Sequence, residues 1–279
     1  MNALIFQSDF GLGDGAVNAM YGVAHSVSPD LSIYDLTHDI TPYDIWEASY
    51  RLVQSVNYWN PGTVFVSVVD PGVGSDRLSI VAKTKTGQYI VTPDNGTLTH
   101  LKLRLGIEEV RIIDESINRL ANSDESYTFY GRDVYAYTGA RLAAGVITFE
   151  EVGPLMNVED IIELPTKEPS LEEGQVTGVI DILDVRFGSL WSNIPKALFK
   201  QLDIHFGDRV EVTISNGHRT LFKNTMIYAK SFADVYVGEA LVYVNSLDNM
   251  AVAINQGSFA RAYNIGTGTN WQITLKKTK

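Results

Sequence analysis

The chain has 279 residues, of which 45% are hydrophobic and 10% aromatic, enough to bury the cores of two medium-sized domains. Its formal net charge of -11 disfavours a nucleic acid or an anionic membrane surface as a partner. The absence of cysteine excludes disulfides, thiolate metal ligands and a cysteine nucleophile.

The N-terminus carries no basic start, and its apolar run at residues 3–6 is too short for a signal peptide. No later apolar run is long enough to span a bilayer. We therefore expect a cytoplasmic protein that does not act on a membrane.

The first part of the chain alternates strand and helix patterns. Residues 3–6 predict a buried strand that runs into a glycine-rich turn at Ser8 and Asp9. Apolar residues at helical spacing then predict a helix that ends before Pro29, and residues 31–36 suit a second strand. This order is typical of a βαβ unit.

The strongest strand pattern lies at residues 63–69, which are β-branched and apolar. It ends at Asp70, and open α/β sheets bind ligands at the carboxyl ends of their strands. Further strands at 78–82 and 89–91 continue the alternation. We expect an α/β sandwich-like domain with a mainly parallel sheet over residues 1–160.

Residues 161–173 are acidic, contain two prolines and lack a sustained apolar period, so they predict a linker. Beyond them the pattern changes to short strand-like runs with one helix after Pro195. We expect a smaller antiparallel β domain, a barrel, over residues 174–279.

Several polar residues at predicted strand ends allow two interpretations. A carboxylate at Asp9 suits a ribose diol as well as it suits a turn. Asp70 and Arg77 flank a glycine turn and could orient a water, although a structural salt bridge is the simpler explanation. His38 could act as a general base, but a hydrogen-bonded structural histidine is favoured. The histidine spacing gives no support for a metal site.

The aromatic cluster around Ser189 and Trp191 could be an adenine platform, although a turn at a strand end is the favoured explanation. The residues alone therefore predict a two-domain protein with carboxylate-rich strand ends and no named reaction.

The order and spacing of many short segments along nearly the whole chain are more specific than any one of them. Together they resemble the S-adenosylmethionine hydroxide adenosyltransferase family, whose relatives, the fluorinases and chlorinases, attack the same carbon with halide. The segments are Ser8-Asp9-Phe10-Gly11 with Asp14, His38 with Pro42, Val68-Val69-Asp70-Pro71-Gly72-Val73-Gly74 with Arg77, Pro93-Asp94-Asn95-Gly96, Thr128-Phe129, Gly131-Arg132-Asp133, Asp184 with Phe187-Gly188, Asn193, Phe232-Ala233-Asp234, and Ser246 before Asn255.

The resemblance implies an N-terminal α/β domain and a C-terminal β barrel. It also implies a homotrimer in which the substrate lies between the first domain of one subunit and the second domain of its neighbour. The reaction implied is nucleophilic substitution at the 5′ carbon of S-adenosylmethionine, which releases methionine and needs no metal or other cofactor.

The resemblance also assigns residues to the ribose and methionine parts of the substrate. Asp9 would accept the ribose hydroxyls, and Tyr43 would pack near the ribose and the reacting carbon. Asp14, Asp184 and Ser246 would hold the amino and carboxylate groups of methionine.

For adenine, the resemblance places Trp191 and Phe232 against the base, with the backbone near Asn255 and Gln256 reading its edge. Ser189 stands where relatives usually carry asparagine, so this adenine contact differs from the family pattern.

Asp70 and Arg77 would hold the attacking water, with Tyr130 completing the catalytic set. Hydrolytic relatives carry histidine at the position of Tyr130, and a tyrosine with a pKa near 10 is a poor base at neutral pH. The Tyr130-Gly131 pair resembles the chlorinase pattern, whereas the carboxylate of Asp70 would repel a halide. We therefore expect hydrolysis to adenosine and L-methionine. The alternatives are halide-dependent adenosyl transfer and binding of S-adenosylmethionine or adenosine without turnover.

Overall fold

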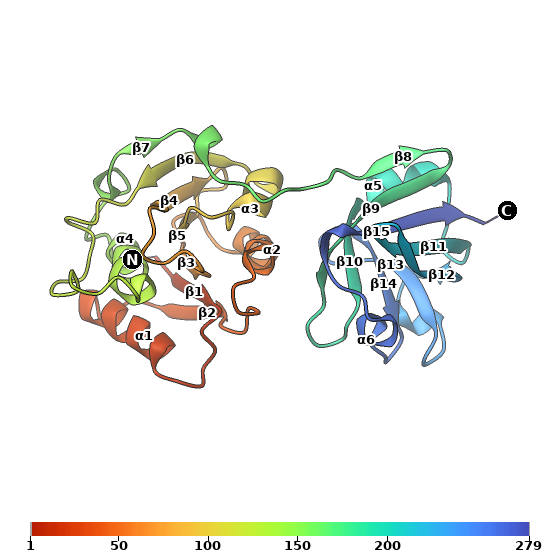
Figure 1. Ribbon diagram of the computed structural model, residues 1–279, viewed down its shortest axis with the longest axis horizontal. Helices are drawn as coiled ribbons and strands as arrows, with labels where there is room; N and C mark the ends of the chain where they lie inside the picture. The colour runs from red at the N-terminus through yellow and green to blue at the C-terminus, as the bar shows by residue number, and fades with distance from the viewer. Residues whose placement is uncertain (1, 279) are drawn as a thin grey trace. The chain divides into compact units, whose positions relative to one another are not determined.

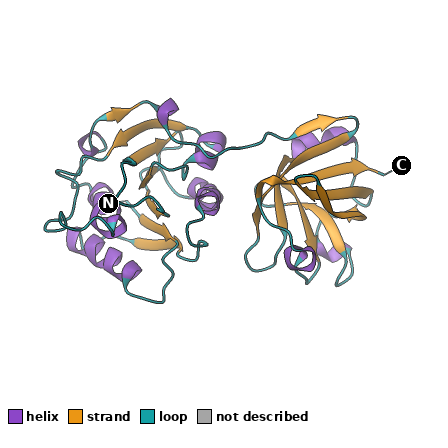
Figure 2. Ribbon diagram, viewed as in Figure 1, coloured by secondary structure: helices purple, strands orange, loops and turns teal. Residues whose placement is uncertain are grey.

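The computed structural model describes residues 2–278, which divide into two units with a boundary between Leu164 and Pro165 (Figure 1). The N-terminal unit mixes helices and strands, whereas the C-terminal unit consists mostly of strands (Figure 2). Each unit has its own hydrophobic core.

A seven-stranded sheet organises the N-terminal unit, in the order β2-β1-β3-β5-β4-β6-β7. The first four strands in this order run parallel, while β4 is antiparallel to both β5 and β6. The predicted α/β unit with a mainly parallel sheet is thereby confirmed. The strands are β1 (Leu4–Ser8), β2 (Ile33–Thr37), β3 (Val64–Val68), β4 (Ser79–Thr84), β5 (Tyr89–Pro93), β6 (Ile107–Ile112) and β7 (Leu155–Met156).

Helices cover both faces of this sheet, because successive side chains of its buried strands point to opposite sides. Leu4 and Phe6 of β1 share one core with residues of α1 and α4, whereas Ile5 shares a second core with residues of α2 and α3. Figure 1 shows α1 and α4 on one side of the sheet and α2 and α3 on the other. The helical segments are α1 (Ala16–Val27), α2 (Ile45–Ser55), η1 (Val56–Tyr58), α3 (Thr99–Arg104), the π-helical η2 (Gly131–Ala136), α4 (Tyr137–Ala144), η3 (Glu150–Val152) and η4 (Val158–Asp160).

The C-terminal unit is a barrel of seven strands, closed by pairing of β9 with β10. The predicted barrel is confirmed, with one correction: β12 and β13 pair in parallel. The loop through η6 (Phe232–Asp234) carries the chain back before β13 begins, so β12 and β13 are not joined by a hairpin turn. The strands are β8 (Ser170–Glu172), β9 (Gln175–Leu183), β10 (Leu190–Pro195), β11 (Arg209–Asn216), β12 (Arg219–Tyr228), β13 (Ala240–Val244), β14 (Asn249–Ile254) and β15 (Gly268–Lys277).

Short helical segments complete this unit: α5 (Lys196–Phe199), η5 (Lys200–Leu202) and α6 (Phe259–Tyr263). In the segment 161–173, Ile162 donates its N–H to Asp94 Oδ1 at 3.0 Å, and Leu164 donates to Thr99 Oγ1 at 2.8 Å. Strand β8 lies farther along the same segment and pairs with β9. Both ends of this acidic segment are therefore attached to folded structure.

Candidate functional site

The first candidate pocket, the N-terminal pocket, lies at the carboxyl ends of β1 and β3. These strands are parallel neighbours with Ser8 opposite Val68, so the turns that follow them bring Asp9 and Asp70 to one edge of the sheet. The pocket has a volume of about 390 Å³, and its lining includes Asp9, Tyr43, Asp70, Phe129 and Tyr130.

Asp9 orders one wall of this pocket through the backbone of Tyr43. Its Oδ2 accepts the Tyr43 N–H at 2.8 Å, and Tyr43 adopts a left-handed φ of 68°. The Tyr43 side chain is 73% exposed, which leaves its ring free to meet a ligand or another protein surface. This hydrogen bond uses Oδ2, and within residues 2–278 the second carboxylate oxygen of Asp9 remains available to the pocket.

Asp70 is held in the same pocket by Arg77. The Arg77 Nε lies 3.0 Å from both Asp70 carboxylate oxygens, and Nη2 lies 2.5 Å from Oδ2. Both side chains are buried, and Arg77 also donates to Ser79 at 3.1 Å. Burial alone would lower the pKa of Arg77, but the hydrogen bonds to Asp70, together with electrostatic interactions with Tyr135, Asp70 and Tyr130, raise it overall. The pair fixes the orientation of the carboxylate.

Tyr130 lies between two guanidinium groups. The Arg77 group lies 4.8 Å from its ring centroid and the Arg119 group 5.1 Å. Burial, together with the nearby carboxylate of Glu115, raises the pKa of its hydroxyl. Tyr130 therefore keeps its proton at neutral pH and offers the pocket an aromatic face or a hydrogen bond, not a base.

The backbone next to Tyr130 is unusual as well, because the π-helical segment η2 begins at Gly131. Such turns are often found at functional sites. A Cβ atom at Gly131 would lie 3.1 Å from the ring of Phe10, another residue of the pocket wall, so glycine permits this close approach.

Two of the predicted residues lie outside the N-terminal pocket. Arg77 does not line the pocket itself but contacts two residues that do, Asp70 and Tyr130. Asp14 accepts the N–H of Ala16 at 2.9 Å and so helps to begin α1. Within the described structure Asp14 is exposed and lines neither candidate pocket.

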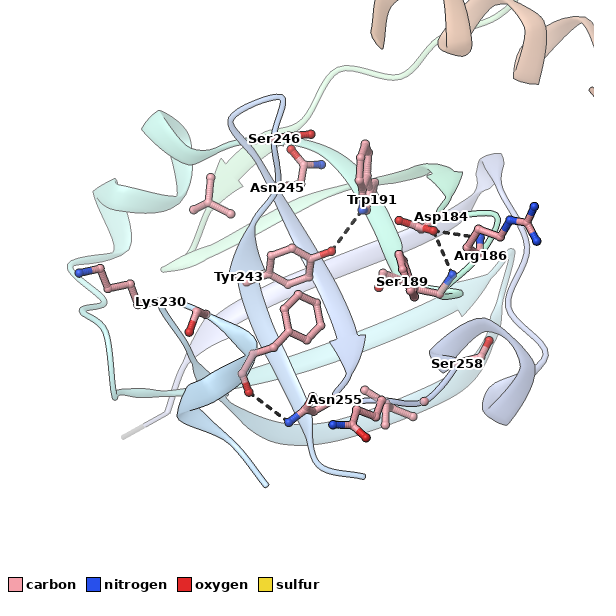
Figure 3. A pocket seen from close by; sticks show the side chains of 17 residues that line it. Asp184, Arg186, Ser189, Trp191, Lys230, Tyr243, Asn245, Ser246, Asn255 and Ser258 are labelled. Carbon is pink, nitrogen blue, oxygen red and sulfur yellow. Dashed lines mark hydrogen bonds between the residues drawn. The ribbon is translucent and has the colours of Figure 1, made fainter. Parts of the chain in front are cut away.

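The second candidate pocket, the barrel pocket, has a volume of about 970 Å³ and lies in the C-terminal unit (Figure 3). It gathers side chains from loops and strands far apart in the sequence. All seven residues predicted for the C-terminal half line it: Asp184, Ser189, Trp191, Phe232, Ser246, Asn255 and Gln256.

Tyr243 joins the aromatic residues of the barrel pocket. Trp191 Nε1 donates to its hydroxyl at 3.2 Å, and the Phe232 ring centroid lies 5.1 Å from its own (Figure 3). Burial raises the pKa of this hydroxyl, so it stays protonated. Tyr243 was not among the residues predicted from the sequence, although it lies on β13 two residues after Leu241, where a period of two places both side chains on one face.

Asp184 and Asn255 shape the loops of the barrel pocket. Asp184 Oδ1 accepts the N–H groups of Arg186 and Phe187, both at 3.0 Å (Figure 3). Asn255 Nδ2 donates to the carbonyl groups of Phe232 at 3.1 Å and Val235 at 2.9 Å. The Asn255 side chain thus holds the Phe232 turn, while the Asn255 backbone N–H donates to the Glu239 carbonyl at 2.9 Å and its carbonyl accepts the Gly238 N–H at 2.8 Å.

Charged groups surround the aromatic part of the barrel pocket. Arg186 and Lys230 lie toward opposite ends, with Asp184 near Ser189 and Trp191 (Figure 3). A surface with aromatic rings, one carboxylate and two cations suits a ligand that combines a flat base with a zwitterion.

Among residues 2–278, no group of three or more His, Asp or Glu side chains is arranged to hold a metal ion. Over the same range, every helix is too short or too polar to cross a membrane.

Comparisons with known proteins place both units in one family. Models described as the N-terminal and C-terminal domains of SAM hydroxide adenosyltransferase match residues 4–153 and 178–272. The chain is 32% identical to an (R)-S-adenosyl-L-methionine hydrolase of Salinispora tropica, with 96% of each covered. It is 27% identical to a fluorinase of Nocardia brasiliensis, covering 98% of this chain and 96% of that protein.

A solved structure of an uncharacterized conserved protein from Thermotoga maritima has the same fold. Its TM-score is 0.88 at 34% identity, and the match covers 98% of this chain and 100% of that one. The fold is therefore shared over the full length of both units.

Proposed function

Because this chain belongs to the S-adenosylmethionine hydroxide adenosyltransferase family and is an enzyme, we propose that it hydrolyses S-adenosylmethionine to adenosine and L-methionine. The observation that carries this proposal is the buried Asp70 carboxylate, clamped by Arg77 in the N-terminal pocket. Its orientation is fixed before a substrate arrives, which suits a group that holds a water for attack.

In the proposed reaction, the water oxygen attacks the 5′ carbon in line with the C–S bond. The C–O bond forms as the C–S bond breaks, and methionine leaves as a neutral thioether. Asp70 accepts a hydrogen bond from the water, and one proton is released overall. Because the sulfonium is a good leaving group, orientation of the water supplies much of the rate.

The same carboxylate favours water over halide. At 4 Å, two like charges near a protein surface repel by about 4 kcal/mol. Arg77 offsets part of this repulsion, but its Nε and Nη2 already donate to Asp70. Tyr130 has no charge at neutral pH and adds a ring face to the wall.

Tyr130 also favours a second candidate, halide-dependent adenosyl transfer. The Tyr130-Gly131 pair resembles the chlorinase pattern, and fluorinases are among the relatives of this chain. A third candidate, binding of S-adenosylmethionine without turnover, would follow if tyrosine at this position had removed the activity.

The substrate divides naturally between the two pockets. We assign the ribose and reacting carbon to Asp9 and Tyr43 of the N-terminal pocket, with adenine against Trp191 and Phe232 of the barrel pocket. Asp184 would hold the methionine amino group, because a carboxylate suits an ammonium.

We further propose that a homotrimer forms and that the barrel pocket of one copy completes the N-terminal pocket of another. Large exposed apolar side chains support this assembly: Tyr43 and Phe187 line the two pockets, and Leu12 and Tyr236 are exposed in the same units. Light scattering of the purified protein tests the trimer, and a monomer that retains full activity would contradict it.

Product analysis tests the reaction. The protein is incubated with S-adenosylmethionine in H₂¹⁸O, with and without chloride. The nucleosides are then separated by chromatography and identified by mass spectrometry. Hydrolysis gives adenosine with ¹⁸O at its 5′ position in both samples. Formation of 5′-chloro-5′-deoxyadenosine would instead establish halide transfer, and calorimetric binding without product would establish the binding protein.

A further inference from the structure

A network of hydrogen bonds runs from the buried side chains of Ser8 and His38, next to the turn that carries Asp9, to the exposed side chain of Asp35. Ser8 Oγ lies 2.7 Å from His38 Nδ1, and His38 Nε2 lies 3.0 Å from Asp35 Oδ1. Tyr21 donates its hydroxyl to Asp35 Oδ2 at 2.5 Å. This hydrogen-bond network thus connects α1 and β2 with the end of β1.

The donors and acceptors of this hydrogen-bond network fit one arrangement in which the His38 imidazole is neutral. The Phe10 N–H donates to Ser8 Oγ at 3.2 Å, and the Ser8 hydroxyl can then donate to His38 Nδ1. This leaves His38 Nε2–H to donate to Asp35, whose other oxygen accepts from Tyr21. Both ring nitrogens of His38 are therefore engaged.

The order serine, histidine, aspartate is that of a hydrolytic triad, but its placement excludes a nucleophilic role. Ser8 is 0% exposed and His38 is 4% exposed, and neither residue lines a candidate pocket within the described chain. The Ser8 oxygen also already accepts the Phe10 N–H. Ser8, His38 and Asp35 therefore stabilise the backbone of the turn at Asp9 and do not attack a substrate.

His38 holds the Asp9 turn on both sides. Its ring binds Ser8, the residue before Asp9, and its carbonyl oxygen accepts the N–H of Gly11 at 2.8 Å. Asp9 and Phe10 lie between these two attachments, and both line the N-terminal pocket. A third link runs from Asp9 Oδ2 to the backbone of Tyr43, five residues after His38.

We propose that His38, oriented by Asp35 and Tyr21, is a positioning residue that sets the Asp9 carboxylate to receive both ribose hydroxyls of the substrate. This inference rests on the proposed function, since it takes Asp9 as the ribose-binding group. Release of Ser8 from His38 leaves a buried hydroxyl without its acceptor and lets the turn move. A small displacement of Asp9 is then enough to lose the two-point contact.

Two variants of His38 separate its two contacts. His38→Asn keeps an acceptor near the position of Nδ1, so Ser8 retains a partner while Asp35 loses one. His38→Gln keeps a donor near the position of Nε2, so Asp35 retains a partner while Ser8 loses one. We expect the glutamine variant to lose ribose recognition and the asparagine variant to keep most of it.

The measurement is the ratio of calorimetric affinities for adenosine and 2′,3′-dideoxyadenosine, which isolates the hydroxyl contact. The wild type should prefer adenosine about tenfold or more, because hydrogen bonds to a charged acceptor are strong. His38→Gln should reduce this preference to that of Asp9→Asn. His25→Asn, a change at an exposed histidine of α1, is the control and should leave the preference unaltered.

Thermal melts identify a purely structural role. Equal melting temperatures with a lost preference in His38→Gln support the proposal, whereas a lowered melting temperature with an intact preference overturns it. If the wild type prefers adenosine and His38→Gln loses that preference, but the wild type hydrolyses no S-adenosylmethionine, the proposed reaction is contradicted and the positioning role of His38 stays in place. A wild type without any preference for adenosine contradicts both the ribose assignment and the role of His38.

Discussion

The two pockets differ in how their polar groups are held. In the N-terminal pocket, Asp70 is fixed by Arg77 and Asp9 by the backbone of Tyr43, so the charged groups are set by contacts within their own unit. In the barrel pocket, Arg186 and Lys230 lie at the ends and aromatic rings fill the centre. The smaller pocket suits chemistry, which needs fixed charges, and the larger pocket suits recognition of a flat, extended ligand.

The largest effect on activity is expected from a substitution in the N-terminal pocket. Asp70→Asn should lower kcat for hydrolysis about 100-fold or more, because the attacking water loses its charged acceptor. KM for S-adenosylmethionine should change little, since no binding contact is removed. The measurement is steady-state kinetics, with Asp76→Asn, at an exposed position of the same turn, as control. An unaltered kcat in Asp70→Asn would remove Asp70 from the mechanism.

The N-terminal unit is expected to lose more stability in acid than the barrel. Burial lowers the pKa of His100 to about 3, so it stays neutral in the folded N-terminal unit. The unfolded state takes up a proton below pH 6.5, so stability falls as the pH falls from about 6.5 toward 3. The expected loss between pH 7 and 5 is about 2 kcal/mol.

Urea titration at the two pH values measures this loss, and hydrogen exchange assigns it to a unit. His100→Gln should flatten the pH dependence, even though it lowers stability by removing a buried group. In the barrel, His205 and His218 are exposed, so His205→Gln is the matched control and should leave the slope as it is. Equal slopes in the wild type and His100→Gln would contradict the assignment.

A smaller effect on activity is expected from a substitution in the barrel pocket. Trp191→Ala should raise KM for S-adenosylmethionine roughly tenfold, because it removes an aromatic surface for adenine and a hydrogen bond to Tyr243. The kcat value should remain near that of the wild type. Tyr263→Ala changes an aromatic residue of the barrel outside the pocket and serves as control. A fall in kcat with unchanged KM would place Trp191 with the chemistry instead.

The smallest expected effect concerns Tyr130. Tyr130→Phe should change kcat/KM less than about threefold, because a phenol whose pKa is raised above its ordinary value near 10 is not the base. For the same reason the pH–rate profile should show no tyrosine-dependent change between pH 7 and 9. Tyr130→His should raise hydrolysis if the position is catalytic in relatives, and no gain would mean that the pocket has adapted to tyrosine.

The sequence predicted the parts of the site that depend on local order. Asp9 and Asp70 each follow an apolar run, so the sequence marked both as carboxylates at strand ends, where open α/β sheets bind ligands. Arg77 was paired with Asp70 because it lies only seven positions farther along the chain, across a glycine turn. The residues of the barrel pocket came from the resemblance to a family and not from periodicity.

The sequence by itself determined that an α/β unit precedes a β unit, since strand and helix periods are local properties of the chain. Only the tertiary structure decided that Tyr243 contacts Trp191 and Phe232, and that Asp14 begins a helix outside both pockets. It also decided that His38 lies behind Asp9, 29 positions away in the chain, through Ser8. These contacts join residues far apart in sequence, and no local period encodes which distant side chain will supply a buried donor with its acceptor.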